Sequence, residues 1–294
     1  MASDIELPGA IPDGRETPAD VLIHSGPIPE ALGAPIAEAP TWQATATDVL
    51  LCIPDIGAFL VRGGEILYSA DPGAVAADLA AFLGGPLLAL WLNLKGRAVV
   101  RASGICVNGK AVLFCGPSGA GKSTLAAALV ARGYPLLVDD VCALTLTPRP
   151  LAHPDTTSLK LWRQAIRRLR LGPVKGAPVR PSLEKYHVDA AGWGLGPAPI
   201  GVVYNLRESR PPHGPGIEAP NVVDATLALR RSAYHSSMVE PLGGRDLYFQ
   251  MAAAIASAAP VFHLTRPLTF PALPETADQL HRHWAEIGLL EAAA

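Results

Sequence analysis

The stretch AVLFCGPSGAGKSTLAAALVARGYPLLVDD, residues 111–140, is the most informative part of the sequence. It starts with an apolar run that predicts a strand and passes through a glycine-rich loop into an alanine- and leucine-rich helix. A second apolar run follows and ends in two aspartates. Residues 116–123 match the pattern G-x-x-x-x-G-K-[ST] of a phosphate-binding loop at every defined position. Because the loop lies between a predicted strand and a predicted helix, the stretch indicates an α/β nucleotide-binding domain.

The residues of this loop have a physical reason to be there. Glycines let the backbone curl so that several N–H groups face one anion, and the N-terminus of the following helix adds a partial positive charge. Lys122 can reach the β- and γ-phosphates, and the Ser123 hydroxyl can bind Mg²⁺, so we expect ATP and Mg²⁺ as cofactors. The predicted nucleotide-binding residues are Gly116, Pro117, Ser118, Gly119, Ala120, Gly121, Lys122, Ser123 and Thr124.

Two aspartates, Asp139 and Asp140, follow the apolar run PLLV. Four apolar residues in a row predict a strand that is buried on both faces, beside the strand that leads into the loop. Acids at the end of such a strand would lie at the edge of the sheet where the phosphates bind. One carboxylate can hold Mg²⁺, and the other can accept a proton from an attacking hydroxyl.

The composition excludes several classes of protein. The 294 residues include 24 Lys and Arg against 26 Asp and Glu, a net charge of -2, whereas a duplex nucleic-acid binder needs a strongly basic face. Hydrophobic residues make up 49% and charged residues 17%, which is ample apolar material for a core. The four cysteines have neither CxxC spacing nor companion histidines, so we expect neither a zinc site nor a disulfide scaffold.

We expect a cytoplasmic protein that makes no use of a membrane. The first residues are acidic where a signal peptide has basic ones. The apolar stretch from Leu79 to Leu94 has 16 uncharged residues, fewer than the roughly 20 of a membrane span, and Gly84-Gly85-Pro86 interrupts it. It therefore predicts two short buried helices, or a helix and a turn.

Changes of pattern divide the chain into three predicted parts. Residues 1–40 contain seven prolines and no regular period, which indicates an extended or loosely attached arm. Residues 41–97 form a small α+β module, with strands expected at 48–54, 58–63 and 65–70 and a turn at Gly63-Gly64. Residues 98–294 alternate strands and helices and form the catalytic domain, which opens with a hairpin turned at Asn108-Gly109.

The run AVLFCGPSGAGKSTLAAALVARGYPLLVDDVCAL, residues 111–144, resembles the catalytic core of the HPr kinase/phosphorylase superfamily. The chain is similar, more closely, to the stand-alone HPr kinase-like serine kinases found beside lasso-peptide biosynthesis enzymes. Weaker matches in the family's order extend over residues 42–290. They are LVRGGEILY (60–68), FLGGPLLAL (82–90), KYHV (185–188), IGVVYNL (200–206) and VFHLTRP (261–267).

This resemblance implies a P-loop kinase core of the HPr kinase type, preceded by the small N-terminal module. The implied activity is ATP-dependent phosphorylation of a peptide or protein serine, such as one in a lasso-peptide precursor. Asp139, helped by Lys122, would be the catalytic residue that takes the seryl proton, and Asp140 with Ser123 would bind Mg²⁺. Because HPr kinases assemble as hexamers, the resemblance also implies a homo-oligomer.

The chain departs from the family at two places. The family carries a histidine 15 positions before the first loop glycine, where this chain has Arg101. Arginine cannot exchange protons near neutral pH, although it can bind phosphate. The signature Leu-Glu-Ile-Arg-Gly of the bifunctional enzymes is also missing, since the corresponding stretch SLKLWRQA (158–165) contains no acid. We therefore expect neither reverse phosphorylase activity nor HPr as the substrate.

The segment 156–183 carries seven basic residues and no acid. One interpretation is a solvated helix face followed by a loop. The other is a lid over the nucleotide or a cradle for an acidic or phosphorylated peptide. The basic residues are Lys160, Arg163, Arg167, Arg168, Arg170, Lys175 and Arg180.

Two other functions fit the same loop. A small-molecule kinase could begin with GPSGAGKST, but such enzymes lack the early pair of aspartates and the front module. A nucleotide-binding regulatory or assembly protein that transfers no phosphate is consistent with Arg101 in place of the histidine. A transport ATPase is disfavoured because the chain has no LSGGQ-like motif.

Overall fold

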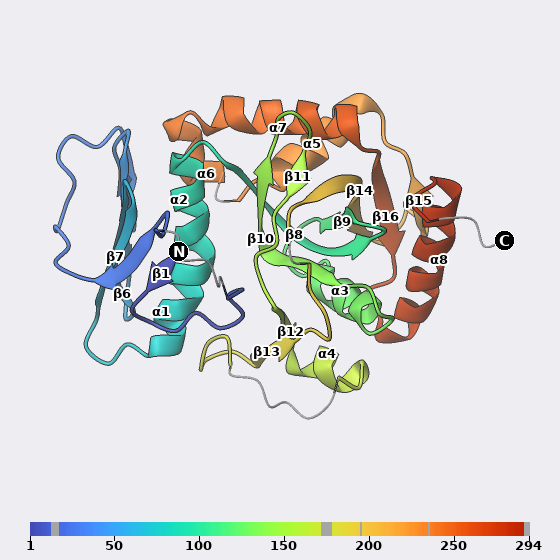
Figure 1. The fold of residues 1–294 in the computed structure, drawn as a ribbon, viewed down its shortest axis with the longest axis horizontal. Coiled ribbons are helices and arrows are strands. Elements are labelled where there is room, and N and C mark those ends of the chain that lie inside the picture. The colour runs from blue at the N-terminus through green and yellow to red at the C-terminus, as the bar shows by residue number, and fades with distance from the viewer. Residues whose placement is uncertain (13–17, 172–177, 195, 235, 291–294) are drawn as a thin grey trace.

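The computed structural model describes residues 1–12, 18–171, 178–194, 196–234 and 236–290. These residues form two larger β-sheets with a long helix between them, and a small hairpin below the second sheet (Figure 1). The second, central sheet carries helices on both faces, so the predicted α/β class is confirmed.

The N-terminal sheet has the strand order β1-β2-β7-β6-β5-β4-β3. Its last three strands in the chain agree with the expected ones to within one residue at each end. The strands are β1 (Ala2–Ser3), β2 (Leu22–Ser25), β3 (Ala37–Ala39), β4 (Trp42–Ala44), β5 (Asp48–Ile53), β6 (Gly57–Arg62) and β7 (Glu65–Ala70).

Residues 1–40, expected as a loosely attached arm, contribute three short strands to this sheet. β2 runs parallel to β7, with Ile23 opposite Ile66. Val21 and Ile23 are buried while Leu22 between them is exposed, as in any half-buried strand. This alternation covers only a few residues among the prolines, which is why the sequence of residues 1–40 shows no regular period.

The central sheet has the order β11-β10-β8-β9-β14-β16-β15. β9, β14 and β16 are parallel to one another, and β8 is antiparallel to both β9 and β10. The hairpin between β8 and β9 turns at Asn108 and Gly109, as predicted, with positive φ at both. The strands are β8 (Ala98–Val107), β9 (Lys110–Cys115), β10 (Leu136–Thr145), β11 (Leu151–Ala152), β14 (Ala198–Glu208), β15 (Gly216–Glu218) and β16 (Val261–Arg266).

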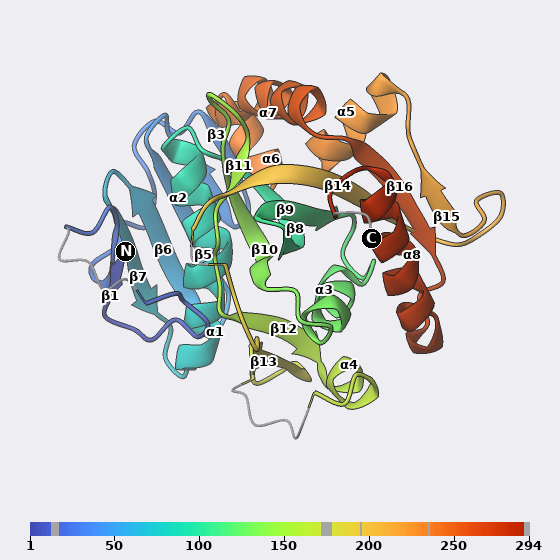
Figure 2. The same cartoon turned by 45° about the vertical axis from the view of Figure 1, so that its right-hand side comes forward.

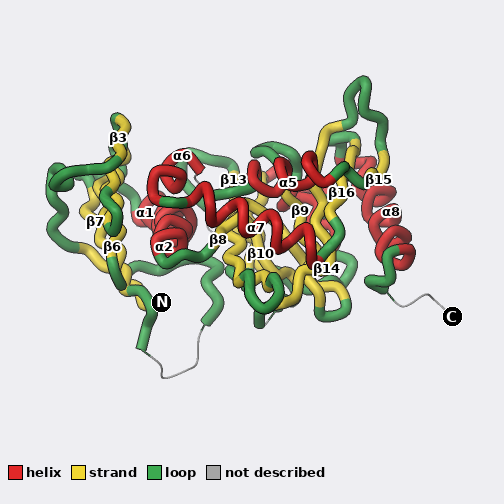
Figure 3. Tube along the Cα trace, turned by 90° about the horizontal axis from the view of Figure 1, so that it is seen from above, coloured by secondary structure: helices red, strands yellow, loops and turns green. Residues whose placement is uncertain are grey.

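Alternate residues of β9 belong to two different cores. Val112 and Phe114 pack with helices α3 (Lys122–Val130) and α8 (Leu273–Glu286) on one face of the sheet. Leu113 and Cys115 pack on the other face with α7 (Gly244–Ala258), which lies beside α5 (Val222–Arg231) across the strands (Figures 2 and 3). The strand that leads into the phosphate loop is therefore held from both sides.

The helix between the sheets is continuous, which corrects the expectation of two separate helices. It consists of α1 (Ala76–Phe82), a π-helical turn η1 (Leu83–Leu87) and α2 (Leu88–Leu94). Pro86 lies inside the π turn, where the wider backbone accommodates the proline without ending the helix.

By length and composition alone, the 19 residues from Ala76 to Leu94 could cross a membrane, and half of the apolar window is buried within the protein. Leu83, Leu87 and Leu90 are at most 1% exposed. They belong to one core that includes residues of both sheets, and α2 contacts β6 on one side and β8 and β10 on the other. The apolar character of this helix therefore serves its packing between the sheets.

The remaining elements are short. The hairpin consists of β12 (Ser158–Trp162) and β13 (Lys185–Asp189), and α4 (Arg163–Arg168) follows β12 directly. The other helices are α6 (Ser236–Val239) and the 3-10 turns η2 (Glu240–Leu242) and η3 (Phe270–Ala272).

Leu83→Ala will lower the free energy of unfolding by about 2–5 kcal/mol, because it leaves a cavity where the helix joins the two sheets. Val75→Ala, just before the same helix, is the control: Val75 is 47% exposed and its loss should cost under about 0.5 kcal/mol. Denaturant unfolding of both variants measures the difference. Equal destabilisation would show that Leu83 does not join the sheets.

Candidate functional site: the phosphate loop and its acids

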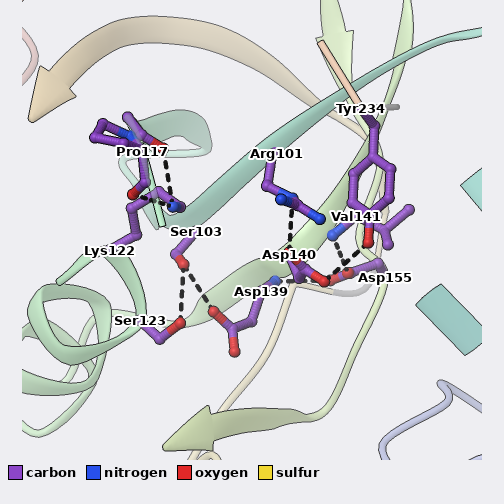
Figure 4. A network of polar contacts seen from close by, with 11 residues as sticks. Arg101, Ser103, Pro117, Lys122, Ser123, Asp139, Asp140, Val141, Asp155 and Tyr234 are labelled. Carbon is purple, nitrogen blue, oxygen red and sulfur yellow. Dashed lines mark hydrogen bonds and ion pairs between the residues drawn. The ribbon is translucent and has the colours of Figure 1, made fainter. Parts of the chain in front are cut away.

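The phosphate loop connects β9 to α3, as the sequence predicts. α3 begins at Lys122, directly after Gly121, which has the left-handed φ of 79° that glycine tolerates best. The Lys122 ammonium donates hydrogen bonds to the carbonyl oxygens of Gly116 (2.9 Å) and Pro117 (3.0 Å). The loop thus curls around its own lysine (Figure 4), and burial lowers the pKa of Lys122.

Asp139 is linked to the phosphate loop through one serine of β8. The Ser103 hydroxyl donates to Asp139 Oδ1 at 2.7 Å and lies 3.4 Å from the Ser123 hydroxyl oxygen (Figure 4). Because the Ser103 O–H points to Asp139, the Ser103 oxygen can only accept in the longer contact, and the Ser123 hydroxyl is its donor. The Lys160 backbone N–H donates to Asp139 Oδ2 at 2.7 Å. Asp139 is 1% exposed, and its carboxylate is therefore held in a fixed position.

Asp140 lies on the other side of the site, with different partners. Its carboxylate is 3.6 Å from Arg101 Nε and accepts a hydrogen bond from the Tyr234 hydroxyl at 3.1 Å. The Arg101 guanidinium stacks on the Tyr234 ring, 4.6 Å from its centre. The structure thus connects Asp139, and not Asp140, to Ser123.

Both aspartates lie within β10 and not at its end, which corrects the expected strand boundary. β10 continues to Thr145, beyond the acids. They nevertheless lie level with the end of β9, because Asp139 is opposite Ser103 and Ala102 is opposite Cys115. The acids and the phosphate loop therefore meet at the same level of the sheet, as the spacing predicts.

Asp155 is a functional residue that the sequence analysis missed. Its two carboxylate oxygens accept hydrogen bonds from the backbone N–H groups of Asp139 (3.0 Å) and Val141 (3.3 Å), on either side of Asp140. Asp140 itself has a φ of 98°, a conformation that is costly for a residue other than glycine. Desolvation raises the pKa of Asp155 to about 7. An isolated acid 16 positions after Asp139 forms no recognisable motif.

Arg266, the last residue of β16, was also missed. Its guanidinium Nη2 donates to the carbonyl oxygens of Ala120 (3.0 Å) and Gly121 (3.3 Å), and the residue is 3% exposed. It therefore supports the phosphate loop through two of its backbone carbonyl groups. Its place in the run VFHLTRP at the end of an apolar strand was the only signal in the sequence.

Two cavities border the phosphate loop. The first, called the acid-side cavity here, has a volume of about 360 Å³ and is lined by most of the predicted site residues, including both aspartates; Gly116, Pro117 and Ala120 line the second cavity instead. The second, of about 690 Å³, lies against residues 116–120 and the end of β14. The acid-side cavity is lined by Arg101, Ser103, Ser118, Gly119, Gly121, Lys122, Ser123, Thr124, Asp139, Asp140, Lys160, Leu161, Trp162 and Lys185.

The oxygen atoms of the acid-side cavity fit Mg²⁺. Nucleotide-bound Mg²⁺ takes one or two carboxylates together with phosphate oxygens, and does not need a cage made by the protein alone. The described residues contain no group of three or more His, Cys, Asp or Glu that could hold a metal ion. Ser123 with one of the two aspartates is therefore the set of protein ligands that this site offers.

Comparison with known proteins supports the phosphate-binding loop. A family model described as an AAA domain matches residues 112–179, which is less than half of the chain and includes the loop and both aspartates. Together with the geometry of the loop, this match shows that the chain contains a P-loop nucleotide-binding domain. No curated protein matches the chain.

Among solved structures, the chain is similar to the Hpr(Ser) kinase/phosphatase from Coxiella burnetii. The sequences are 15% identical, and the match covers 64% of this chain and 98% of that one. The TM-score is 0.32, which is too low to establish a common fold.

Gly121→Ala will weaken ATP binding at least tenfold without unfolding the protein. A Cβ at this position would collide with Arg266 Nη2 and would also strain the left-handed backbone. Gly133→Ala is the matched control, because Gly133 has a φ of 96° but open space around its Cβ position. ATP titration calorimetry on both variants tests this. If both lose the same affinity, the contact with Arg266 is irrelevant.

Asp155→Asn will change how stability depends on pH. The folded-state pKa of Asp155, about 7, lies above the usual value near 4, so the folded protein holds one more proton than the unfolded chain between these values. The stability contributed by Asp155 is therefore present below about pH 4 and is lost as pH rises through 7. Asparagine does not titrate, and its amide can accept only one of the two N–H groups.

Denaturant unfolding from pH 4 to 8 tests this prediction. The stability difference between the wild type and Asp155→Asn should shrink as pH rises, with a slope that approaches one proton per molecule. Asp189→Asn on the exposed end of β13 serves as the control. Parallel stability curves for the wild type and Asp155→Asn would contradict the assignment.

Proposed function

We propose that the protein is an ATP-dependent kinase that phosphorylates a serine of a peptide or protein. One observation carries this proposal: Asp139 lies in the same cavity as Lys122 and is joined to Ser123 through Ser103. A buried carboxylate beside the phosphate loop has the position that a general base requires. The resemblance to HPr kinase-like serine kinases supports serine as the acceptor and a lasso-peptide precursor as its source.

In the proposed reaction the seryl oxygen attacks the γ-phosphorus of ATP. A new P–O bond forms to serine, the bond between the γ-phosphorus and the β,γ-bridging oxygen breaks, and ADP leaves. The seryl proton passes to the Asp139 carboxylate. Lys122 and the backbone N–H groups of the loop hold the phosphates and stabilise the charge on the transferred group. Bound Mg²⁺ supplies further neutralisation of the phosphate oxygens.

We assign the metal to Ser123 and Asp140, and the base to Asp139. The opposite assignment makes Asp139 the metal ligand and Asp140 the base, and one observation favours it. Ser123 is connected through Ser103 to Asp139, whereas Asp140 contacts Arg101 and Tyr234. The two assignments differ in one measurable respect. Loss of a metal ligand raises the Mg²⁺ concentration needed for activity, whereas loss of the base lowers the rate at saturating Mg²⁺.

A nucleotide-binding protein without transfer activity is the second candidate. The observation in its favour is that the Arg101 guanidinium lies 3.6 Å from the Asp140 carboxylate, so one of the two acids is paired with a cation of the protein itself. ATP binding with no phosphorylated product from any serine peptide would identify this function.

Asp139→Asn will reduce phosphate transfer roughly 10²–10⁴-fold while ATP still binds, because the amide cannot accept the seryl proton. Mass spectrometry for an added phosphate on candidate precursor peptides measures transfer, and calorimetry measures ATP affinity. Lys122→Ala is the complementary variant and should weaken ATP binding itself. Unreduced transfer by a folded Asp139→Asn variant would remove Asp139 from its role. If Asp139→Asn instead needs more Mg²⁺ for activity, Asp139 is the metal ligand and Asp140 is the base.

A further inference from the structure

The hairpin β12–β13 forms one wall of the acid-side cavity, and its hydrogen-bond pattern shows which edge faces the site. The Arg163 backbone N–H donates to the Glu184 carbonyl at 2.8 Å, so these two residues form a hydrogen-bonded pair. Such pairs alternate along an antiparallel ladder. Leu161 and Tyr186 are therefore hydrogen-bonded partners, and the main-chain groups of Lys160 and Trp162 point away from β13.

The Asp139 carboxylate lies at this outer edge of β12. The contact of 2.7 Å from the Lys160 N–H to Asp139 Oδ2 confirms that the main chain of Lys160 points toward the acid. Lys160 C=O and Trp162 N–H lie along the same edge, and both residues line the cavity. A second extended chain can pair with a strand edge of this kind by main-chain hydrogen bonds.

The side chains beside this edge are basic and aromatic. Lys160 and Trp162 lie on one face of the hairpin, together with Lys185 opposite Trp162, because side chains alternate along a strand. Trp162 is 52% exposed, whereas Leu159 and Leu161 on the opposite face are at most 2% exposed and belong to the core. The hairpin thus presents two ammonium groups and an exposed indole to the cavity.

We propose that the acceptor chain binds in an extended conformation along the outer edge of β12. Its serine lies at Asp139, its acidic side chains contact Lys160 and Lys185, and Trp162 packs against its backbone. This inference rests on the proposed kinase function, since it places the acceptor of that reaction. It also bears on the second interpretation of the basic segment 156–183, because it gives Lys160, one of the seven basic residues, to the peptide and not to the nucleotide.

The geometry also gives the position of the acid in the acceptor. The Asp139 carboxylate accepts the hydrogen bond of the Lys160 N–H, so the acceptor chain does not pair with that group. The next main-chain groups along this edge are Lys160 C=O and Trp162 N–H. The acceptor therefore pairs with β12 from Lys160 toward Trp162. Residues two apart in an extended chain point to the same face. We place the seryl side chain on the face of the hairpin that carries Lys185. An acidic residue two positions from the serine then lies on that same face, while an acid one position away points to the opposite face.

The test uses fluorescein-labelled twelve-residue peptides of Ala and Gly around one serine. Three peptides carry Glu two positions from the serine on both sides, Glu one position away on both sides, or Lys two positions away on both sides. Fluorescence anisotropy with the full chain measures binding, with and without a non-hydrolysable ATP analogue and Mg²⁺. We expect the first peptide to bind about tenfold more tightly than the other two.

Variants assign this preference to the hairpin. Lys185→Glu should reverse it, so that the Lys peptide binds more tightly than the Glu peptide, and Trp162→Ala should weaken all three peptides. Arg167→Glu changes an exposed basic residue that does not line the cavity, and it should leave the order unchanged. Arg167→Glu should also leave ATP affinity unchanged.

The outcomes separate this inference from the kinase function. If Lys185→Glu weakens ATP binding and leaves the peptide order unchanged, the lysines serve the nucleotide and the inference is wrong. If the peptides bind equally to the wild type, it is also wrong, whether or not they are phosphorylated. If the preference and its reversal are observed but no peptide gains a phosphate, the docking edge stands and the kinase function fails.

Discussion

The site depends on a local break in the regular geometry of β10. Consecutive side chains of a strand point to opposite faces, so two neighbouring aspartates should not reach one cavity. The φ of 98° at Asp140 breaks this alternation, and both carboxylates line the acid-side cavity. Asp155 holds the break in place because it accepts the N–H groups on either side. β11 pairs with β10 only at Leu144 and Thr145, beyond the two aspartates. At the aspartates, the Asp155 side chain therefore accepts the backbone N–H groups of β10 that a neighbouring strand would otherwise accept.

The same face of β8 completes the arrangement. Arg101 and Ser103 are two residues apart and therefore point together into the cavity, where each meets one of the aspartates. The cavity wall behind them is rigid because the buried helix between the two sheets packs against β8 and β10. The apolar helix of the N-terminal module and the position of the acids are thus linked through one core. This link gives the N-terminal sheet and the helix beside it a structural role in the site, although they contribute none of the residues that line the acid-side cavity.

Much of this arrangement could be predicted from the sequence because it follows local rules. The strand, loop and helix around Lys122 form a contiguous pattern, and the Asn108-Gly109 turn has a strong conformational preference. Asp155 and Arg266 could not be predicted, because their roles come from long-range contacts that no spacing encodes. The helix through Pro86 was misjudged for another reason: a proline ends a regular α-helix but fits in a π turn, and packing on both sides stabilises that turn.

Arg101 gives the site a fixed charge where a histidine would give a titratable one. Its guanidinium lies between the Tyr234 ring and the Asp140 carboxylate, and it keeps its charge at any physiological pH. It therefore cannot take a proton from an attacking water or hydroxyl, and the carboxylates are the only proton acceptors among the described residues that line the acid-side cavity.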